Sequence, residues 1–313
     1  MKSRSRKTNI AGKWAMLFFG LLIVPNFVPN FVPNFAFAQS DAQKSASNSA
    51  AGPVAAAVSD SSKARELLAK GVEAYKTGLF DIAIEDFKQA KNLDPSLTDA
   101  RLYLAAAYSG RYIPGAPSDE NVRQGQQAVE EYKEVLANDP NNLMAIDGMG
   151  AILYNMAGGP SIDLAKFAEA KSYQQRHISI QDDDPEPYYW IGVIDWALAY
   201  HANKDLRDAV NLKSPNGQIG DNDPMPPAMA AEFAAKNAAT IEEGISNLRM
   251  AIDRRPEYDD AMAYLNLMYR QKADTETTPQ AWQADIKDAD DLVEKVVAIK
   301  KRRLENPDPN PTN

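Results

Sequence analysis

The stretch RELLAKGVEAYKTGLFDIAIEDFKQAKNLDP, which runs from Arg65 to Pro95, decides the fold of this chain. Within it, Ala83, Phe87 and Ala90 are separated by steps of four and three residues, which place them on one stripe of a helix. The proline that follows five residues after Ala90 would end that helix. The apolar residues before the short turn in this stretch predict another helix, so the stretch as a whole predicts a pair of helices.

The same spacing recurs further along the chain. It is present at Ala128, Tyr132, Val135 and Pro140, and again at Gly244, Leu248, Ala251 and Pro256. Recurrence over intervals of this length is typical of stacked helical hairpins rather than of one compact globule. We count five units between about Ala64 and Arg303, with the first and last expected to act as caps. The predicted fold is therefore all-α, a solenoid of helical-hairpin repeats.

The stretch from Arg65 to Pro95 resembles a tetratricopeptide repeat (TPR), and the resemblance covers one whole repeat. Gly71 lies where that family places a small residue so that two helices approach closely, and Ala83 and Ala90 lie at its small contact positions. The other units match more loosely. The resemblance implies a right-handed superhelix in which the first helix of each hairpin lines a concave, peptide-binding face.

Several units depart from the family spacing in the same way. The gap before the second-helix stripe is nine residues from Ala74 to Ala83, but twenty residues from Tyr108 to Ala128. Eleven added residues make about three helical turns, so they lengthen a helix without moving its buried face. We therefore expect long second helices, whose N-caps are predicted at Ser118, Ser161 and Thr278.

The fourth unit carries a large insertion at 202–236. Its middle, SPNGQIGDNDPMPP at 214–227, is rich in turn-forming residues. We expect one helix over 227–236 and a second helix starting at Thr240, which forms a capping-box pair with Glu243.

Residues 1–38 read as an export signal. A basic region is followed by eleven apolar residues at 14–24, a run too short to span a bilayer. The motif AFA fits the small-x-small cleavage pattern, so we expect cleavage between Ala38 and Gln39 and a periplasmic or secreted protein. The tandem VPNFVPNFVPNF at 24–35 is either a slipped duplication in a tolerant segment or a retained anchor.

The composition of the chain argues against several classes of binding partner and covalent modification. The chain has 34 basic and 43 acidic residues, a net charge of −9, so its surface repels nucleic acid and anionic lipid headgroups. It has no Cys, which excludes disulfides and a lipid on an N-terminal cysteine. A flexible linker at 39–60 and a disordered tail at 305–313 are predicted to flank a repeat domain at 61–304. No transmembrane segment is expected in the mature chain.

Catalytic and metal-binding motifs are nearly absent from the sequence. His177 and His201 are its two histidines, and neither has a second histidine at helical spacing, so no zinc motif forms. We interpret His177 as a packing residue and His201 as the end of a helix. The aspartates at 182–184 and 221–223 lack the spacing of a calcium loop. We therefore expect no metal, no cofactor and no enzymatic activity.

Asp195 is the one carboxylate that invites a second interpretation. It lies within YYWIGVIDWALAY at 188–200, the most apolar and aromatic helix of the mature chain, so it must be paired or solvated. A Lys or Arg on a neighbouring helix would make it structural. A raised pKa would instead suit a binding or acid/base group. The chain would then be an envelope enzyme or a glycan-binding protein. A second carboxylate that converges on Asp195 would favour this interpretation.

The TPR resemblance also assigns a set of groove residues, half of which could equally pack between helices. The face that they would line is aromatic and sparsely charged, which suits an apolar or aromatic peptide, or a sugar ring, better than an acidic peptide terminus. The leading prediction is an exported, non-catalytic scaffold that binds a protein or peptide in the cell envelope. The predicted groove consists of Tyr75, Lys76, Leu102, Asp147, Tyr154, Asn155, Tyr189, Trp196 and Arg270.

Overall fold

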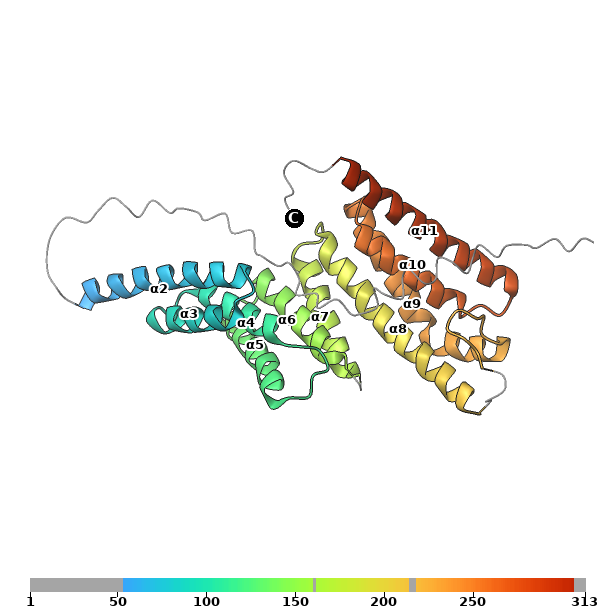
Figure 1. Ribbon diagram of the computed structural model, residues 1–313, viewed down its shortest axis with the longest axis horizontal. Coiled ribbons are helices and arrows are strands. Elements are labelled where there is room, and N and C mark those ends of the chain that lie inside the picture. Colours follow the sequence, from blue (N-terminus) through green and yellow to red (C-terminus); the bar gives the residue numbers. More distant parts are fainter. Residues whose placement is uncertain (1–52, 160–161, 214–217, 307–313) are drawn as a thin grey trace, which may run out of the picture. The chain divides into compact units, whose positions relative to one another are not determined.

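The computed structural model describes residues 53–159, 162–213 and 218–306, and these form ten α-helices and no strand (Figure 1). The all-α prediction is confirmed. The predicted export signal, with its cleavage position between Ala38 and Gln39, lies outside the described residues. The helices are α2 (Pro53–Lys76), α3 (Phe80–Leu93), α4 (Thr98–Arg111), α5 (Asp119–Asn138), α6 (Leu143–Ala157), α7 (Leu164–Ile180), α8 (Pro185–Lys213), α9 (Pro227–Arg254), α10 (Asp259–Ala273) and α11 (Pro279–Glu305).

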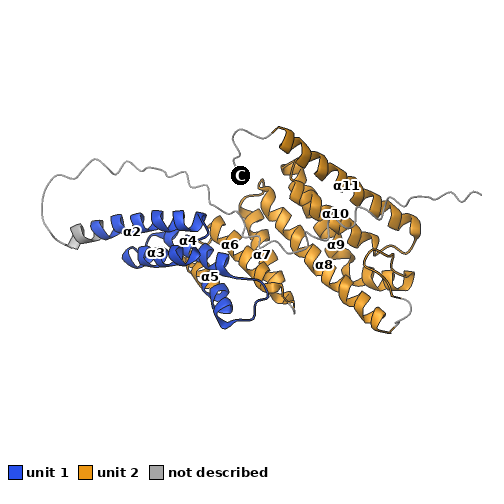
Figure 2. Cartoon of the chain, viewed as in Figure 1, with its two compact units in different colours: residues 1–128 blue, residues 129–313 orange. Residues whose placement is uncertain are grey.

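The chain divides into two compact units, residues 1–128 and 129–313, with the division inside α5 (Figure 2). In the first unit, α2 packs against α3, and α3 against α4. In the second, the hairpins α6–α7, α8–α9 and α10–α11 follow one another, and α7 packs on α8, α9 on α10, and α8 on α10. Within each unit, neighbouring helices thus bury their apolar faces against one another. This is the helical-hairpin repeat architecture of tetratricopeptide proteins.

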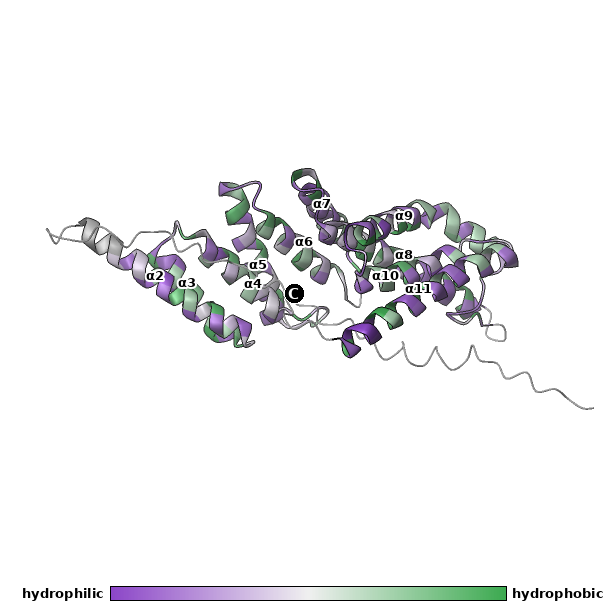
Figure 3. Ribbon diagram, turned by 90° about the horizontal axis from the view of Figure 1, so that it is seen from above, coloured by the Kyte–Doolittle hydropathy of each residue, from purple (hydrophilic) through white to green (hydrophobic). Residues whose placement is uncertain are grey.

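The repeated sequence stripe is the buried face of the second helices. Ala83, Phe87 and Ala90 are fully buried on α3, as are Leu248 and Ala251 on α9. Hydrophobic and hydrophilic residues alternate along the helices in Figure 3, as expected of amphipathic helices in such a stack. None of the described helices combines the length and apolarity that crossing a bilayer requires.

Gly71 shows why the first repeat needs a residue without a side chain. A Cβ atom at this position of α2 would lie only 2.5 Å from the ring of Phe87 on α3. The two helices therefore pack at a distance that only glycine allows here. The small-residue role that the TPR resemblance assigned to Gly71 is confirmed.

The lengthened second helices are also confirmed. The helices α5, α7, α9 and α11 have 20, 17, 28 and 27 residues, against 14 in α3. Ser118 and Thr278 accept hydrogen bonds from backbone N–H groups three residues later, at 3.2 and 3.3 Å, as predicted for N-caps. Ser161 lies outside the described residues, and the side chain of Asp163 caps α7.

The prediction for the insertion at 202–236 was wrong in part. The helix α8 continues to Lys213, so His201 does not end a helix, and α9 runs unbroken from Pro227 through Thr240. The segment AMAAEFAAKNAAT is so rich in alanine that its helix propensity carries the helix past the expected capping box. The insertion therefore lengthens both arms of the α8–α9 hairpin, and the turn-forming residues make only the connection.

The predicted linker at 39–60 overlaps a helix, because α2 begins at Pro53. Proline suits the first position of a helix, and the VAAAV that follows it favours helix, although the Ala/Ser bias of the segment indicated a linker. Residues 39–52, and the part of the predicted tail at 307–313, lie outside the described residues.

Candidate partner-binding surface

The candidate surface is a row of aromatic side chains in the second unit, which we call the aromatic ladder. Neighbouring rings contact each other edge-on or stacked, with centroids 5.3–5.7 Å apart. All of them lie on the first helices of three successive hairpins, as predicted for a TPR groove. The ladder consists of Tyr154 on α6, of Tyr189, Trp190, Trp196 and Tyr200 on α8, and of Tyr264 on α10.

The ladder is only partly buried. Tyr189 is 6% exposed and belongs to the core, whereas Tyr154, Trp196 and Tyr264 are half-buried and Tyr200 is 36% exposed. Tyr189 is therefore corrected from a groove residue to a packing residue, because the rings of neighbouring helices cover it. The half-buried rings pack against the core and keep part of their surface exposed.

The surroundings of the ladder disfavour negative charge. Burial raises the pKa of the Tyr154 phenol and raises that of Tyr189 well above its ordinary value. Burial also raises the pKa of Tyr264 to about 12, and the nearby Asp260 carboxylate adds to this shift. Desolvation therefore disfavours the ionised form of each of these phenols.

Two of the predicted groove residues in the first unit belong to the core. Tyr75 and Leu102 are 8% and 5% exposed, and the Tyr75 ring packs edge-on against Phe80 and Tyr103. The short α2–α3 turn brings Phe80 over Tyr75, which the repeat register alone did not indicate. The third, Lys76, is exposed and forms an ion pair with Glu73 at 3.2 Å.

The remaining predicted groove residues lie in the second unit but outside the ladder. Arg270 pairs with Asp290 on α11 at 2.6 Å, which directs its guanidinium toward the next helix. Asn155 is half-buried beside Tyr154 in the sequence of α6. Of the predicted set, the structure brings together Tyr154, Tyr189 and Trp196. Sequence reasoning missed Trp190, Tyr200 and Tyr264, although the spacing of four residues from Trp196 to Tyr200 was a usable signal.

Asp147, the last predicted groove residue, contacts the ring of His177. The two side chains are joined at 2.6 Å between Oδ1 and Nδ1, and the other ring nitrogen of His177 lies 3.6 Å from Asp184. Burial alone would lower the pKa of His177, but the charges of Asp147 and Asp184 outweigh it and raise the pKa. His177 is buried, as predicted, but it links α6 to α7 through an ionic contact rather than through apolar packing.

Asp195 has the basic partner that one interpretation required. It is completely buried, and Lys171 on α7 lies 2.8 Å from its carboxylate. Lys171 also lies 2.8 Å from Glu243 on α9, so two carboxylates converge on one ammonium. Burial raises the pKa of Asp195 to about 7, and Lys171 opposes this shift.

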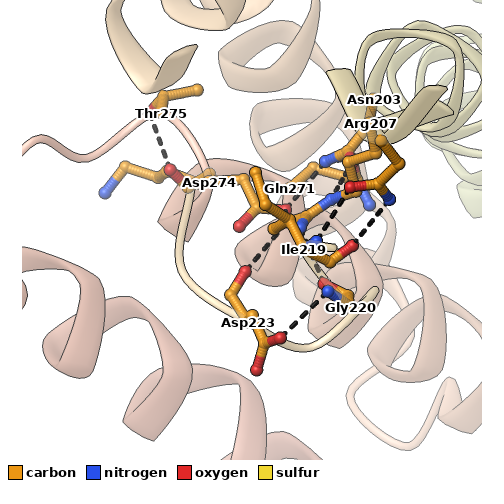
Figure 4. Close-up of polar contacts among 10 residues, drawn as sticks. Asn203, Arg207, Ile219, Gly220, Asp223, Gln271, Asp274 and Thr275 are labelled. Carbon is orange, nitrogen blue, oxygen red and sulfur yellow. Dashed lines mark hydrogen bonds and ion pairs between the residues drawn. The ribbon is translucent and has the colours of Figure 1, made fainter. Parts of the chain in front are cut away.

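Arg207 anchors the insertion through buried polar contacts that sequence reasoning missed. It donates to the Asp274 carboxylate at 2.7 Å and to the Asn203 side-chain oxygen at 2.8 Å (Figure 4). It also donates to two backbone carbonyls of the loop 220–223, at 2.8 and 3.1 Å. Asn203 donates in turn to Gln271 and Asp274. The network fixes the connecting loop to the end of α10.

Within the described ranges, no group of three or more His, Asp or Glu side chains is placed to hold a metal ion. Of the two aspartates in the insertion loop, Asp221 and Asp223, the second stabilises the loop itself, since it accepts a hydrogen bond from the Gly220 backbone N–H at 2.9 Å.

Solved structures with a similar arrangement of helices include MamA and YrrB. One crystal structure of MamA aligns over 80% of this chain and 98% of its own length, with 14% identity and a TM-score of 0.47. MamA from Desulfovibrio magneticus RS-1 aligns over 77% and 97%, with 16% identity and a TM-score of 0.48. YrrB, described as a TPR protein with an unusual peptide-binding site, aligns over 80% and 100%, with 14% identity and a TM-score of 0.45.

No protein-family model matches the chain, and no curated protein is detectably similar to it in sequence. Identities and TM-scores this low say nothing about a ligand. The class of the protein, a helical-repeat protein of the TPR type, follows from its own hairpins, and its candidate surface from its own aromatic ladder.

Proposed function

We propose that this chain is an exported, non-catalytic scaffold that binds a segment of another protein, or a peptide, in the cell envelope. The observation that carries the proposal is the partly exposed aromatic ladder, which crosses three helices in the second unit. Tyr and Trp side chains bury much area on binding and lose little conformational entropy, which makes them effective anchors. A row of such rings suits a segment that lies across successive hairpins.

The enzyme or glycan-binding alternative depended on Asp195 and a second carboxylate. Glu243 does converge on the same site, but the Lys171 ammonium lies in contact with both groups. Asp195 has no exposed surface at which to meet a substrate. Its raised pKa follows from burial inside a three-helix junction, so we interpret the convergence of Glu243 as part of a structural ion-pair cluster around Lys171.

Export is the part of the proposal that rests on residues 1–38. Their basic region, short apolar run and AFA motif support cleavage after Ala38. N-terminal sequencing of the protein from the envelope fraction should give a chain that begins at Gln39. A mature chain that still begins near Met1 would contradict the export step and leave the binding role untouched.

A crosslinking experiment tests the binding role. The full chain is expressed in its own cells, crosslinked in the envelope fraction and recovered with its partner for mass spectrometry. The variants Tyr154→Ala and Trp196→Ala should recover less partner than the wild type. Tyr173→Ala is the matched control, because this half-buried tyrosine lies on α7 outside the ladder. Equal recovery with all three variants would contradict a binding role for the ladder.

A further inference from the structure

The second unit contains an internal example of how its surface holds an arginine. The guanidinium of Arg255 lies 4.3 Å from the centroid of the Tyr258 ring and donates to Glu186 at 2.8 Å. The Tyr258 hydroxyl donates to the other oxygen of Glu186, also at 2.8 Å. A ring face and an adjacent carboxylate together therefore bind one guanidinium group.

Tyr264 and Asp260 offer the same two groups on α10, one helical turn apart. The two residues are four positions apart on α10, so their side chains lie on the same face of the helix. The Asp260 charge also contributes to the raised pKa of Tyr264. In the described part of the chain, no Lys or Arg lies over the Tyr264 ring or forms an ion pair with Asp260. Lys300 and Arg303, whose charges act on Asp260, form their ion pairs with Asp259, at 3.7 and 2.8 Å.

We propose that the partner segment presents an arginine side chain, which stacks on Tyr264 of the ladder and pairs with Asp260. This inference rests on the proposed function and names the chemistry of its partner. Trp196, whose ring centroid lies 5.3 Å from that of Tyr264, borders the same position. Arginine fits better than lysine, because its planar guanidinium both stacks on a ring and forks onto a carboxylate, whereas an ammonium is a compact and strongly hydrated charge.

The charge around the ladder distinguishes this partner from others. Burial and the neighbouring Asp259 raise the pKa of Asp260, and the charges of Lys300 and Arg303 oppose this shift, so a cation at closer range would stabilise the carboxylate further. The chain as a whole carries a net charge of −9, which attracts a basic segment and repels an acidic one. A neutral aromatic segment would use the rings alone and would not depend on Asp260.

A peptide selection on the full-length protein tests the arginine. Random twelve-residue peptides displayed on phage are selected against the wild type, and the affinity of each selected peptide is then measured by fluorescence anisotropy. We expect arginine to be enriched over lysine among the selected peptides. Replacing that arginine by lysine or glutamine in the peptide should weaken binding about tenfold or more, because a hydrogen-bonded charge pair is lost or impaired. This comparison uses only the wild-type protein.

The protein variants provide the matched comparison. Asp260→Asn should weaken the selected peptides about tenfold, whereas Asp253→Asn, which removes an exposed carboxylate from α9, should leave their affinity unchanged. Circular dichroism melts confirm that both variants fold.

The inference would be overturned if the selected peptides lack arginine. It would also be overturned if replacing their arginine leaves the affinity unchanged. If such peptides still depend on Trp196, the proposed function stands. If no selected peptide depends on the ladder, both the proposed function and the inference fail.

Discussion

Lys171 on α7 compensates the charge of Asp195 on α8, with 2.8 Å between the ammonium and a carboxylate oxygen of a completely buried aspartate. The same ammonium reaches Glu243 on α9. Among the described residues, the second oxygen of Asp195 has no hydrogen-bond partner, so Lys171 carries the compensation. The ion pairs of Lys171 therefore connect α7 to α8 and α9, in addition to the packing of the buried residues Phe167 and Ala170 of α7.

Lys171→Met should destabilise the protein strongly. It leaves Asp195 buried without a partner, and breaking one half of a buried ion pair costs about 3–5 kcal/mol. Urea unfolding followed by circular dichroism measures this loss. Lys204→Met is the control, because its ion pair with Asp208 is exposed to solvent, so its loss should leave the stability near that of the wild type. Equal losses from the two variants would show that Lys171 does not compensate Asp195.

Stability should fall as pH rises through neutrality. The pKa of Asp195 is about 7 in the folded protein against an ordinary value of 3.8, and that of His177 is raised above 6.5. The folded state therefore binds more protons than the unfolded state, so this stabilisation is complete at low pH and is lost as pH rises through the folded pKa values. The free energy of unfolding should be lower at about pH 8.5 than at about pH 5.5.

The variant Asp195→Asn separates the contribution of Asp195 to this pH dependence. It removes the titrating group and keeps the shape of the side chain, so the difference in stability between the two pH values should shrink. A wild type whose stability is the same at both values, or greater at the higher one, would contradict the raised pKa values.

The buried faces of the helices could be predicted because they depend on local periodicity. The steps of four and three residues identified Phe87 and Leu248 as core, and the apolar sequence around Asp195 gave a basic partner as one of two interpretations, which the structure bears out. The sequence could not say that the partner is Lys171, because that depends on how α7 packs on α8. The break expected at Thr240 was wrong because alanine-rich helix propensity outweighs a local capping signal.

The candidate surface was only partly predictable. A helical register gives the direction of a side chain, but not what the next helix lays over it, which is why Tyr75 and Tyr189 were expected to line a groove and are buried. Tyr264 was missed because its contact with Trp196 joins residues 68 positions apart in the sequence. Arg207 was missed for the same reason, since Asp274 lies far along the chain.

Arg207→Met should release the connecting loop of the α8–α9 hairpin. Arg207 is 3% exposed, and its loss leaves Asp274 buried without its cation, at a cost of about 3–5 kcal/mol. The loop 220–223 would also lose both hydrogen bonds from the guanidinium. Urea unfolding should show the loss of stability, and limited proteolysis should show faster cleavage at 218–226.

Lys213→Met at the exposed end of the same helix provides the control for this variant. It changes a cation of similar size without touching the network, so both stability and cleavage should stay near those of the wild type. Unchanged cleavage of the loop in Arg207→Met would mean that other contacts hold it in place.

Tyr200→Ala is the ladder variant that separates binding from packing. Tyr200 is 36% exposed and touches the ladder only through its stacking on Trp196, so its truncation should cost less than about 1 kcal/mol of stability. If Tyr200 is a binding anchor, its truncation should also weaken the binding of a peptide selected on the wild type by about 2 kcal/mol. Tyr189→Ala is the opposite case, because this buried ring should cost about 3–5 kcal/mol of stability, as other large core truncations do. Melting curves and fluorescence anisotropy on both variants measure the two quantities side by side. If Tyr200→Ala binds as tightly as the wild type, the exposed end of the ladder takes no part in binding, and the contact with the partner is confined to the rings around Tyr264.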